Sequence, residues 1–249
     1  RTGRHTAELG HGLASDPLAG KDLVFLAADP ELGRDLGRRA KELGVPVIDL
    51  AETFNGDPSV PLVVAGVNDG VLTKKTLVVA GPHPVAVILA HAFRALGRKF
   101  GVSKAVTFVL EPASAFDDPG IQELASQSVS LLTGANPKKS VFKEQLAFNI
   151  LSHSGPLGPD GFGEGERRIV AELRRILDDP GFPISLTAIQ APVFHTYSMM
   201  LYVELEKDAS AEALESLFAG LPAFKTTTFR EGCGASSISV SGMAVTSSK

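Results

Sequence analysis

Short apolar runs that alternate with helix-like segments constrain the fold of this chain most. The run at 23–28 has the length of a buried strand, and Asp29-Pro30 directly after it is a typical helix cap followed by a first-turn proline. Gly44 then predicts the helix end, and the next apolar run, at 45–50, follows within a few residues. Strands joined by one short helix run parallel, so we predict half of a doubly wound sheet.

Two further apolar runs, at 61–65 and 76–80, extend this predicted sheet. The second leads through Gly81-Pro-His-Pro84 into an apolar helix over 85–96. A junction of this kind lies at the carboxyl edge of the sheet, where ligands usually bind in such folds.

After Lys104 the predicted elements become longer and change their order. The patterns predict strands at 105–110 and 146–151, helices at 121–132, 164–177 and 211–218, an antiparallel strand pair at 184–194 and 199–206, and a weak strand near 238–245. The fold class is therefore α/β, with a partial Rossmann-like parallel-sheet domain and an α+β domain that has a mixed, mostly antiparallel sheet. We place the first domain at 1–103, the second at 104–225, and at 226–249 a tail that returns toward the first domain.

Charge and composition exclude several classes of function. The 24 Lys and Arg against 28 Asp and Glu give a net charge of −4, which excludes a broad basic surface for nucleic acid. The longest apolar run, at 85–95, contains His91 and Arg94 and is too short to cross a bilayer. A single cysteine, Cys233, excludes an intrachain disulfide and fits a reducing compartment. We expect a cytoplasmic protein without nucleic-acid or membrane partners.

A series of short motifs with collinear spacing runs along nearly the whole chain. These motifs lie at 47–49, 60–64, 67–68, 111–114, 123–127, 131–134, 147–149 and 191–194. Together they resemble the aspartate-semialdehyde dehydrogenase family, and most closely its Usg-1-like branch. The resemblance implies an NADP-binding domain joined to a dimerisation and catalytic domain, a homodimer, and the reductive dephosphorylation of an acyl phosphate in amino-acid biosynthesis.

The resemblance also indicates which residues stand at the reacting positions. The family's cysteine nucleophile corresponds to Pro84, which has no nucleophilic atom but suits a first helical turn. The catalytic histidine corresponds to Tyr197, and a phenol with a pKa near ~10 is a poor base at neutral pH. An arginine expected to pair with a substrate carboxylate corresponds to Ala191. We assign no catalytic residue.

Two positions remain candidates for substrate binding. Glu111 opens the segment that holds the acyl group in the family, although its carboxylate would repel an acyl phosphate. Arg168, with Glu166 nearby, takes the place of a lysine that helps to bind phosphate.

Cofactor residues cannot be assigned from this sequence. It contains no glycine-rich dinucleotide turn before a helix, and the resemblance places that turn upstream of Arg1 and the family's closing helix after Lys249. We expect that the chain is trimmed at both ends or never had these pieces, so NADP binding is possible only in the intact protein.

The remaining polar residues have plainer interpretations. We expect His83 to cap a helix or face solvent, His195 to be structural and on the opposite strand face from Phe194, and Cys233 to be inert. The arginine stripe on the helix at 164–177, with Glu164 and Glu172, is typical of a solvated face. The other histidines lack metal-ligand spacing and predict no metal site; they are His5, His11, His91 and His153.

Three functional hypotheses follow, and whether the chain is an enzyme stays open. The first is a catalytically degenerate family member with a binding, assembly or regulatory role. The second is an active NADP-dependent oxidoreductase with a relocated nucleophile, or one that uses Tyr197 as an acid. The third is a structural dimer module without a ligand, in which strands pair across a two-fold axis.

Overall fold

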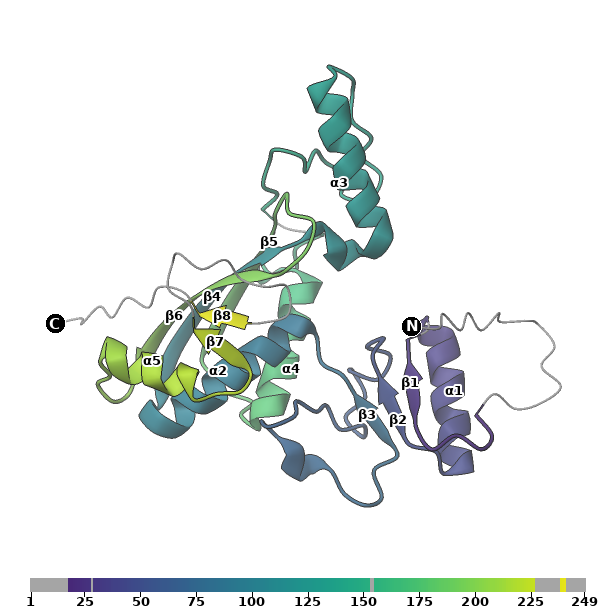
Figure 1. Cartoon of the computed structure of the whole chain (residues 1–249), viewed down its shortest axis with the longest axis vertical. Helices are drawn as coiled ribbons and strands as arrows, with labels where there is room; N and C mark the ends of the chain where they lie inside the picture. Colours follow the sequence, from purple (N-terminus) through teal and green to yellow (C-terminus); the bar gives the residue numbers. More distant parts are fainter. Residues whose placement is uncertain (1–17, 28, 153–154, 227–237, 241–249) are drawn as a thin grey trace, which may run out of the picture. The chain divides into compact units, whose positions relative to one another are not determined.

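The computed structural model describes residues 18–27, 29–152, 155–226 and 238–240 (Figure 1). The chain divides into two compact units, residues 1–82 and 83–249, and we describe each by itself. The domain ranges expected from the sequence stay predictions. Where the structure describes the chain, it contains no helix both long and apolar enough to span a membrane.

The first unit is built on a parallel sheet of three strands, which confirms the predicted α/β class. The strands are β1 (Val24–Leu26), β2 (Val47–Asp49) and β3 (Val78–Ala80), in the order β1-β2-β3. The run expected as a strand at 61–65 contributes only an isolated bridge between Leu62 and Ala80. The Asn68 side chain explains this difference, because it accepts the Val64 N–H and donates to the Leu62 carbonyl, which turns the chain away.

Helix α1 (Pro30–Leu43) connects β1 to β2 and confirms both predicted end signals. The Asp29 carboxylate accepts the N–H groups of Glu31 and Leu32, each at 3.1 Å, so it satisfies two donors that the first turn leaves unpaired. Gly44 ends the helix at φ 69°, a left-handed conformation that glycine adopts without steric strain. A short 3-10 turn, η1 (Asp69–Val71), precedes β3.

The second unit contains a mixed sheet in which β4 (Val102–Glu111) is central. Strand β5 (Ile184–Gln190) is parallel to β4 and β6 (Ser198–Leu205) is antiparallel to it, giving the order β5-β4-β6. The expectation that 184–194 and 199–206 form an antiparallel pair is therefore wrong. Strand β4 lies between β5 and β6, so the connection at 191–197 spans about 10 Å across the end of β4. Two strands paired directly with each other would need only a tight turn.

The two faces of this sheet differ in what covers them. One face carries Ala105, Thr107 and Val109 of β4, which are buried. Helices α2 (Pro84–Phe100) and α4 (Glu164–Leu177) pack against each other and against β4 and β5 on that face (Figure 1). On the opposite face Phe108 is 47% exposed, so a row of apolar side chains remains open to solvent.

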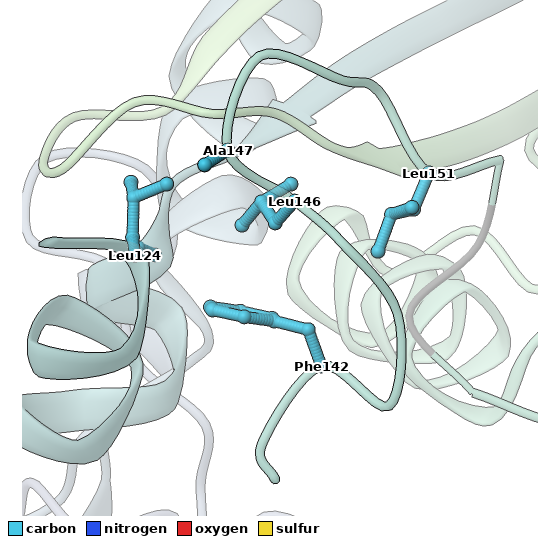
Figure 2. Packing of buried hydrophobic residues seen from close by; sticks show 6 residues of the cluster. Leu124, Phe142, Leu146, Ala147 and Leu151 are labelled. Carbon is cyan, nitrogen blue, oxygen red and sulfur yellow. The ribbon is translucent and has the colours of Figure 1, made fainter. Parts of the chain in front are cut away.

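Helix α3 (Asp117–Leu132) follows a short 3-10 segment, η2 (Ala113–Phe116), after β4 and forms its own small core. Figure 2 shows this core, in which Leu124 of α3 packs with Phe142, Leu146, Ala147 and Leu151 from the following segment. The strand expected at 146–151 is absent apart from one bridge between Leu151 and Gln190. The φ of 60° at Phe148 interrupts any extended run there, so the prediction of a strand is wrong.

The last described elements are helix α5 (Ala211–Ala219) and the parallel strands β7 (Phe224–Thr226) and β8 (Ile238–Val240). Ser210 caps α5, since its hydroxyl accepts the Ala213 N–H at 3.2 Å. The remainder of the strand predicted near 238–245 lies outside the described residues, as does Cys233.

Candidate functional site at the start of helix α2

Helix α2 begins where the resemblance places the nucleophile. Pro84 is its first residue, where the fixed φ of proline suits a helix and the missing N–H costs little. His83 precedes it as the N-cap, and its Nδ1 accepts the Val85 N–H at 3.2 Å. This hydrogen bond confirms the prediction that His83 caps the helix. His83 is only 8% exposed, so it is buried rather than solvent-facing.

A carboxylate from α4 contacts the same helix start. Glu172 is 4% exposed, and its Oε2 accepts the His83 backbone N–H at 2.7 Å. Its other oxygen lies 3.9 Å from Nε of Arg168, one helical turn earlier on α4. Arg168, which is about half exposed, is thereby placed beside the start of α2.

Glu172 is a site residue that the sequence interpretation missed, because it was assigned to a solvated face. The sequence contains a signal for its burial: Ile169, Leu173 and Ile176 form the apolar stripe of α4, and Glu172 falls within that stripe. A charged residue on an apolar stripe is buried, and a buried carboxylate needs hydrogen-bond donors.

Tyr197 completes the cluster from the connection between β5 and β6. Its ring meets the His83 ring edge-on, with centroids 5.6 Å apart and planes at 73°. The structure therefore brings together three residues: Tyr197 at the predicted base position, His83 next to the predicted nucleophile position, and Arg168. His195 lies in the same connection, which is not a strand, so the expected alternation with Phe194 does not apply; His195 is exposed.

The charge state of His83 follows from its surroundings. Burial, and secondarily the positive charge of Arg168, lowers the pKa of His83 from 6.5 to about 4. The ring is therefore neutral near pH 7. Because Nδ1 accepts the Val85 N–H, the neutral ring carries its proton on Nε2.

Glu111 and Ala191 lie where the ends of β4 and β5 meet. Glu111 is the last residue of β4 and is 8% exposed, and its backbone carbonyl accepts the side-chain N–H of Gln190 at 3.0 Å and the Ala191 N–H at 2.9 Å. Ala191 is buried and presents only a methyl group at the position where the resemblance leads us to expect an arginine. A substrate contact by Glu111 stays a prediction, as it does for Arg168.

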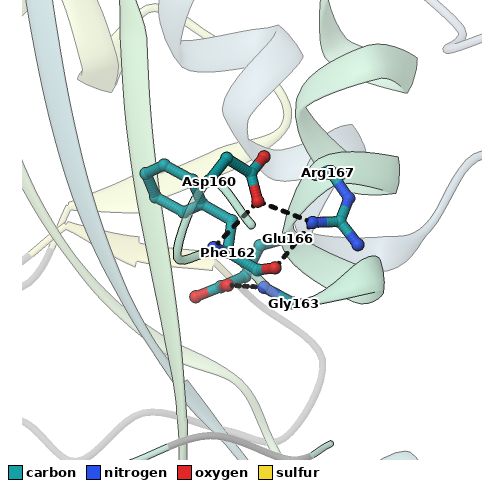
Figure 3. A network of polar contacts seen from close by, with 5 residues as sticks. All are labelled: Asp160, Phe162, Gly163, Glu166 and Arg167. Carbon is teal, nitrogen blue, oxygen red and sulfur yellow. Dashed lines mark hydrogen bonds and ion pairs between the residues drawn. The ribbon is translucent and has the colours of Figure 1, made fainter. Parts of the chain in front are cut away.

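The position of Arg168 depends on how the first turn of α4 is anchored (Figure 3). Glu166 accepts the Gly163 N–H at 2.5 Å and the Ala188 N–H of β5 at 2.8 Å, which ties the helix start to the sheet. Arg167 donates to the Asp160 carboxylate at 2.8 Å and to the Phe162 carbonyl at 2.7 Å. Arg167 thus closes the preceding turn and is not available as an anion site.

Asp160 responds to the same contacts. The Phe162 N–H is the largest cause of a lowered pKa of this carboxyl, and the Arg167 charge and hydrogen bond act in the same direction. The carboxylate therefore stays ionised and keeps Arg167 engaged.

Metal and dinucleotide binding find no support in the described residues. Within them, no group of three or more His, Cys, Asp or Glu side chains is arranged to hold a metal ion. His5, His11 and His153 lie outside the described residues.

The carboxyl edge of the first unit does not fit a dinucleotide. The Asp49 carboxylate accepts the N–H groups of Ala51 and Phe54, each at 2.9 Å, so the loop after β2 already uses it. The Asp49 carbonyl accepts the Gly81 N–H at 2.8 Å, which joins the ends of β2 and β3 directly. With no glycine-rich turn in the sequence, these groups form no cradle for a pyrophosphate.

Comparisons with known proteins identify the family of this chain. Residues 95–232, more than half of the chain, match the model described as "Semialdehyde dehydrogenase, dimerisation domain". The chain is 34% identical over 207 residues to a USG-1 protein homolog of Azotobacter vinelandii, an alignment that covers 80% of this chain and 60% of the relative. It is 29% identical over 206 residues to an aspartate-semialdehyde dehydrogenase of Aquifex aeolicus, covering 82% and 61%. The chain thus spans about three fifths of these relatives.

Solved structures agree with the sequence matches. A probable aspartate-semialdehyde dehydrogenase from Pseudomonas aeruginosa superposes with a TM-score of 0.82 at 25% identity, covering 91% of this chain and 70% of that one. An aspartate-semialdehyde dehydrogenase with NADP from Candida albicans, at 14% identity, shares the fold with a TM-score of 0.61 over 86% and 63%. The chain belongs to the semialdehyde dehydrogenase family, among relatives named aspartate-semialdehyde dehydrogenase and USG-1 homolog.

Proposed function

We propose that this chain is a catalytically degenerate member of its family that acts by binding or assembly as a homodimer in the cytoplasm. The observation that carries the proposal is Pro84 at the first position of α2, beside a cap that His83 already completes. The family reaction needs a thiolate at this place, and proline offers no atom that could attack an acyl carbon.

Donors at the helix start that could hold an anion in place of the thiolate are also engaged. Pro84 has no N–H, and the Val85 N–H is bonded to Nδ1 of His83. Among the first backbone donors, the His83 N–H is bonded to the Glu172 carboxylate. These two N–H groups, which could otherwise stabilise a developing negative charge, are therefore engaged within the protein.

Neither ring in the cluster replaces the missing base. The Nδ1 lone pair of His83 is engaged in the cap, and protonation of this buried ring beside Arg168 is unfavourable, as its lowered pKa of about 4 indicates. Tyr197 is a phenol, which accepts protons poorly at neutral pH. Ala191 also removes the cation that would hold a substrate carboxylate.

Self-association is the function that the described residues support best. On the open face of the β5-β4-β6 sheet, Phe108 pairs across the strands with Met200, and Val106 pairs with Tyr202. Phe108, Met200 and Tyr202 are 47%, 73% and 50% exposed, which leaves a contiguous apolar row on two adjacent strands. The matched family model describes a dimerisation domain, so we propose that a second copy of the chain covers this row.

The proposed loss of catalysis is tested by assaying the full-length gene product for turnover with NADP, phosphate and aspartate semialdehyde. We expect no phosphate-dependent formation of NADPH, with the Aquifex aeolicus relative as the positive control. Turnover that Tyr197→Phe abolishes would refute the proposal and support an active enzyme that uses this phenol.

A thermal-shift titration separates ligand binding from a purely structural role. A ligand that binds only the native state raises the melting temperature by mass action. A shift with NADP or phosphate would indicate a retained binding role in the intact protein. No shift with either ligand would support the third hypothesis, a structural dimer module without a ligand.

A further inference from the structure

A cavity of about 340 Å³ lies on the first unit, and it is lined entirely by residues of that unit. It is formed by the end of α1, the segment before the bridge at Leu62, and the turn that leads into β3. Its volume lies within the usual range of small-molecule sites, toward the small end.

The charge of this cavity is positive. Lys41 and Lys75 both line it, and no aspartate or glutamate does. Within the described part of the chain, neither ammonium group has an ion-pair partner. The carboxylate of Asp57, which is not a lining residue, is engaged by the lining residue Ser59, whose N–H and hydroxyl both donate to its Oδ1, at 2.8 and 2.7 Å.

The cavity also offers a hydroxyl donor. The hydroxyls of Thr73 and Thr76, both lining residues, lie 3.1 Å apart and share one hydrogen bond. The Thr73 hydroxyl also accepts the Lys75 N–H, and the Thr76 hydroxyl accepts the Thr73 N–H. Two hydroxyls carry two hydrogens and only one is needed for the shared bond, which leaves one to donate to a bound group.

The floor of the cavity is apolar. Val60 and Val78 are 1% and 3% exposed, and Pro61 and Leu77 lie beside them. A bound molecule would thus meet two cations and a hydroxyl at the rim and hydrocarbon below.

We propose that this cavity is a binding site for a small phosphate monoester with an apolar body. Two lysine ammonium groups match the charge of a phosphate dianion, and lysine is a common point-charge partner of phosphate. The apolar floor then accommodates the organic part.

The cavity shares no residue with the cluster around His83. Lys41 precedes β2, residues 59–61 precede the bridging Leu62, and residues 73–77 precede β3. Asp49 and Gly81 lie at the opposite, carboxyl ends of β2 and β3, so within the first unit the cavity lies at the amino edge of the sheet. The proposal therefore stands or falls independently of whether the family reaction is lost.

The test is a calorimetric titration of the full chain with phenyl phosphate at low ionic strength, repeated with inorganic phosphate and with uncharged benzyl alcohol. We expect saturable binding of phenyl phosphate, weaker binding of phosphate, and none of benzyl alcohol. Lys41→Ala with Lys75→Ala should weaken the binding by at least about tenfold, because both charges that match the dianion are removed.

Two further variants decide where the ligand binds. Lys74→Ala removes an adjacent exposed lysine that does not line the cavity, and we expect binding to be unchanged. An equal loss in Lys74→Ala would show unspecific attraction and overturn the proposal. Absence of saturable binding, or a loss caused by Arg168→Ala and not by the lysine pair, would overturn it as well.

Discussion

At the scale of single residues, His83 shows how one side chain can fix both structure and charge at the start of a helix, where the family resemblance places the nucleophile. The ring caps α2 through Nδ1, packs edge-on against Tyr197, and lies near the Arg168 charge. Burial and the Arg168 charge favour the neutral ring, and Nδ1 can accept the Val85 N–H only in that ring. The native state therefore resists a proton that the unfolded chain accepts readily.

This difference predicts a pH-dependent stability. The folded pKa of about 4 lies below the ordinary 6.5, so the unfolded chain binds more protons between these values and stability falls as the pH drops through that window. Between about pH 7 and about pH 5, His83 should remove about 2 kcal/mol from the free energy of unfolding. Urea unfolding of wild type and of His83→Asn, whose amide oxygen can still cap the helix, measures this contribution.

His195 supplies the matched control, because it is an exposed histidine in the same unit. His195→Asn should leave the pH slope of wild type unchanged, whereas His83→Asn should flatten it. Equal slopes in wild type and His83→Asn would contradict the assignment.

At the scale of elements, α3 is joined to the segment that follows it by two polar side chains. The Gln127 amide oxygen accepts the N–H groups of Leu146 and Ala147, at 2.8 and 3.1 Å, and its nitrogen donates to the carbonyls of Lys138 and Glu144. Glu123 accepts the N–H groups of a tight run, Ser140, Val141 and Phe142. These side chains take the place of strand partners, so the segment folds without joining a sheet.

Replacing Gln127 tests this role. Gln127 is fully buried, and Gln127→Leu would leave the Leu146 and Ala147 N–H groups without their partner inside the protein. We expect a loss of about 3 kcal/mol in the free energy of unfolding and faster amide exchange at 138–147. Gln122→Leu, on the exposed side of α3, should change neither; equal effects of the two variants would refute the role.

The same elements show which parts of the fold a sequence can predict. Asp29, Gly44 and the apolar stripe of α4 act on their own neighbours, so the ends of α1 and the bounds of α4 could be predicted. The partner of β5 depends on residues about eighty positions away along β4, which no local pattern encodes. The position of Tyr197 near α2 could be expected from the family motif, but the contact of Glu172 with His83 could not, since it joins two helices.

At the scale of the whole molecule, the open face of the β5-β4-β6 sheet is the surface through which we propose that the chain assembles. The face is edged by an ion pair between Lys104 and Glu204 at 3.4 Å, and Tyr202 donates to Glu204 at 3.3 Å. Polar residues at the rim of an apolar row are typical of an interface that forms between folded copies. The buried face behind it is filled by α2 and α4, so the proposed dimer face and the candidate site share one scaffold.

Met200→Glu tests assembly through this face. Met200 is 73% exposed and pairs with Phe108, so a glutamate there would place an unpaired carboxylate within the proposed interface without disturbing the core. Burying such a charge costs several kcal/mol, which should weaken a dimer by about a hundredfold or more. Sedimentation velocity should then show a dimer for wild type and a monomer for Met200→Glu. Leu132→Glu, which adds the same charge at a 77% exposed residue of α3, should remain dimeric. A monomeric wild type, or dissociation of both variants, would show that the row on β4 and β6 is not where two copies meet.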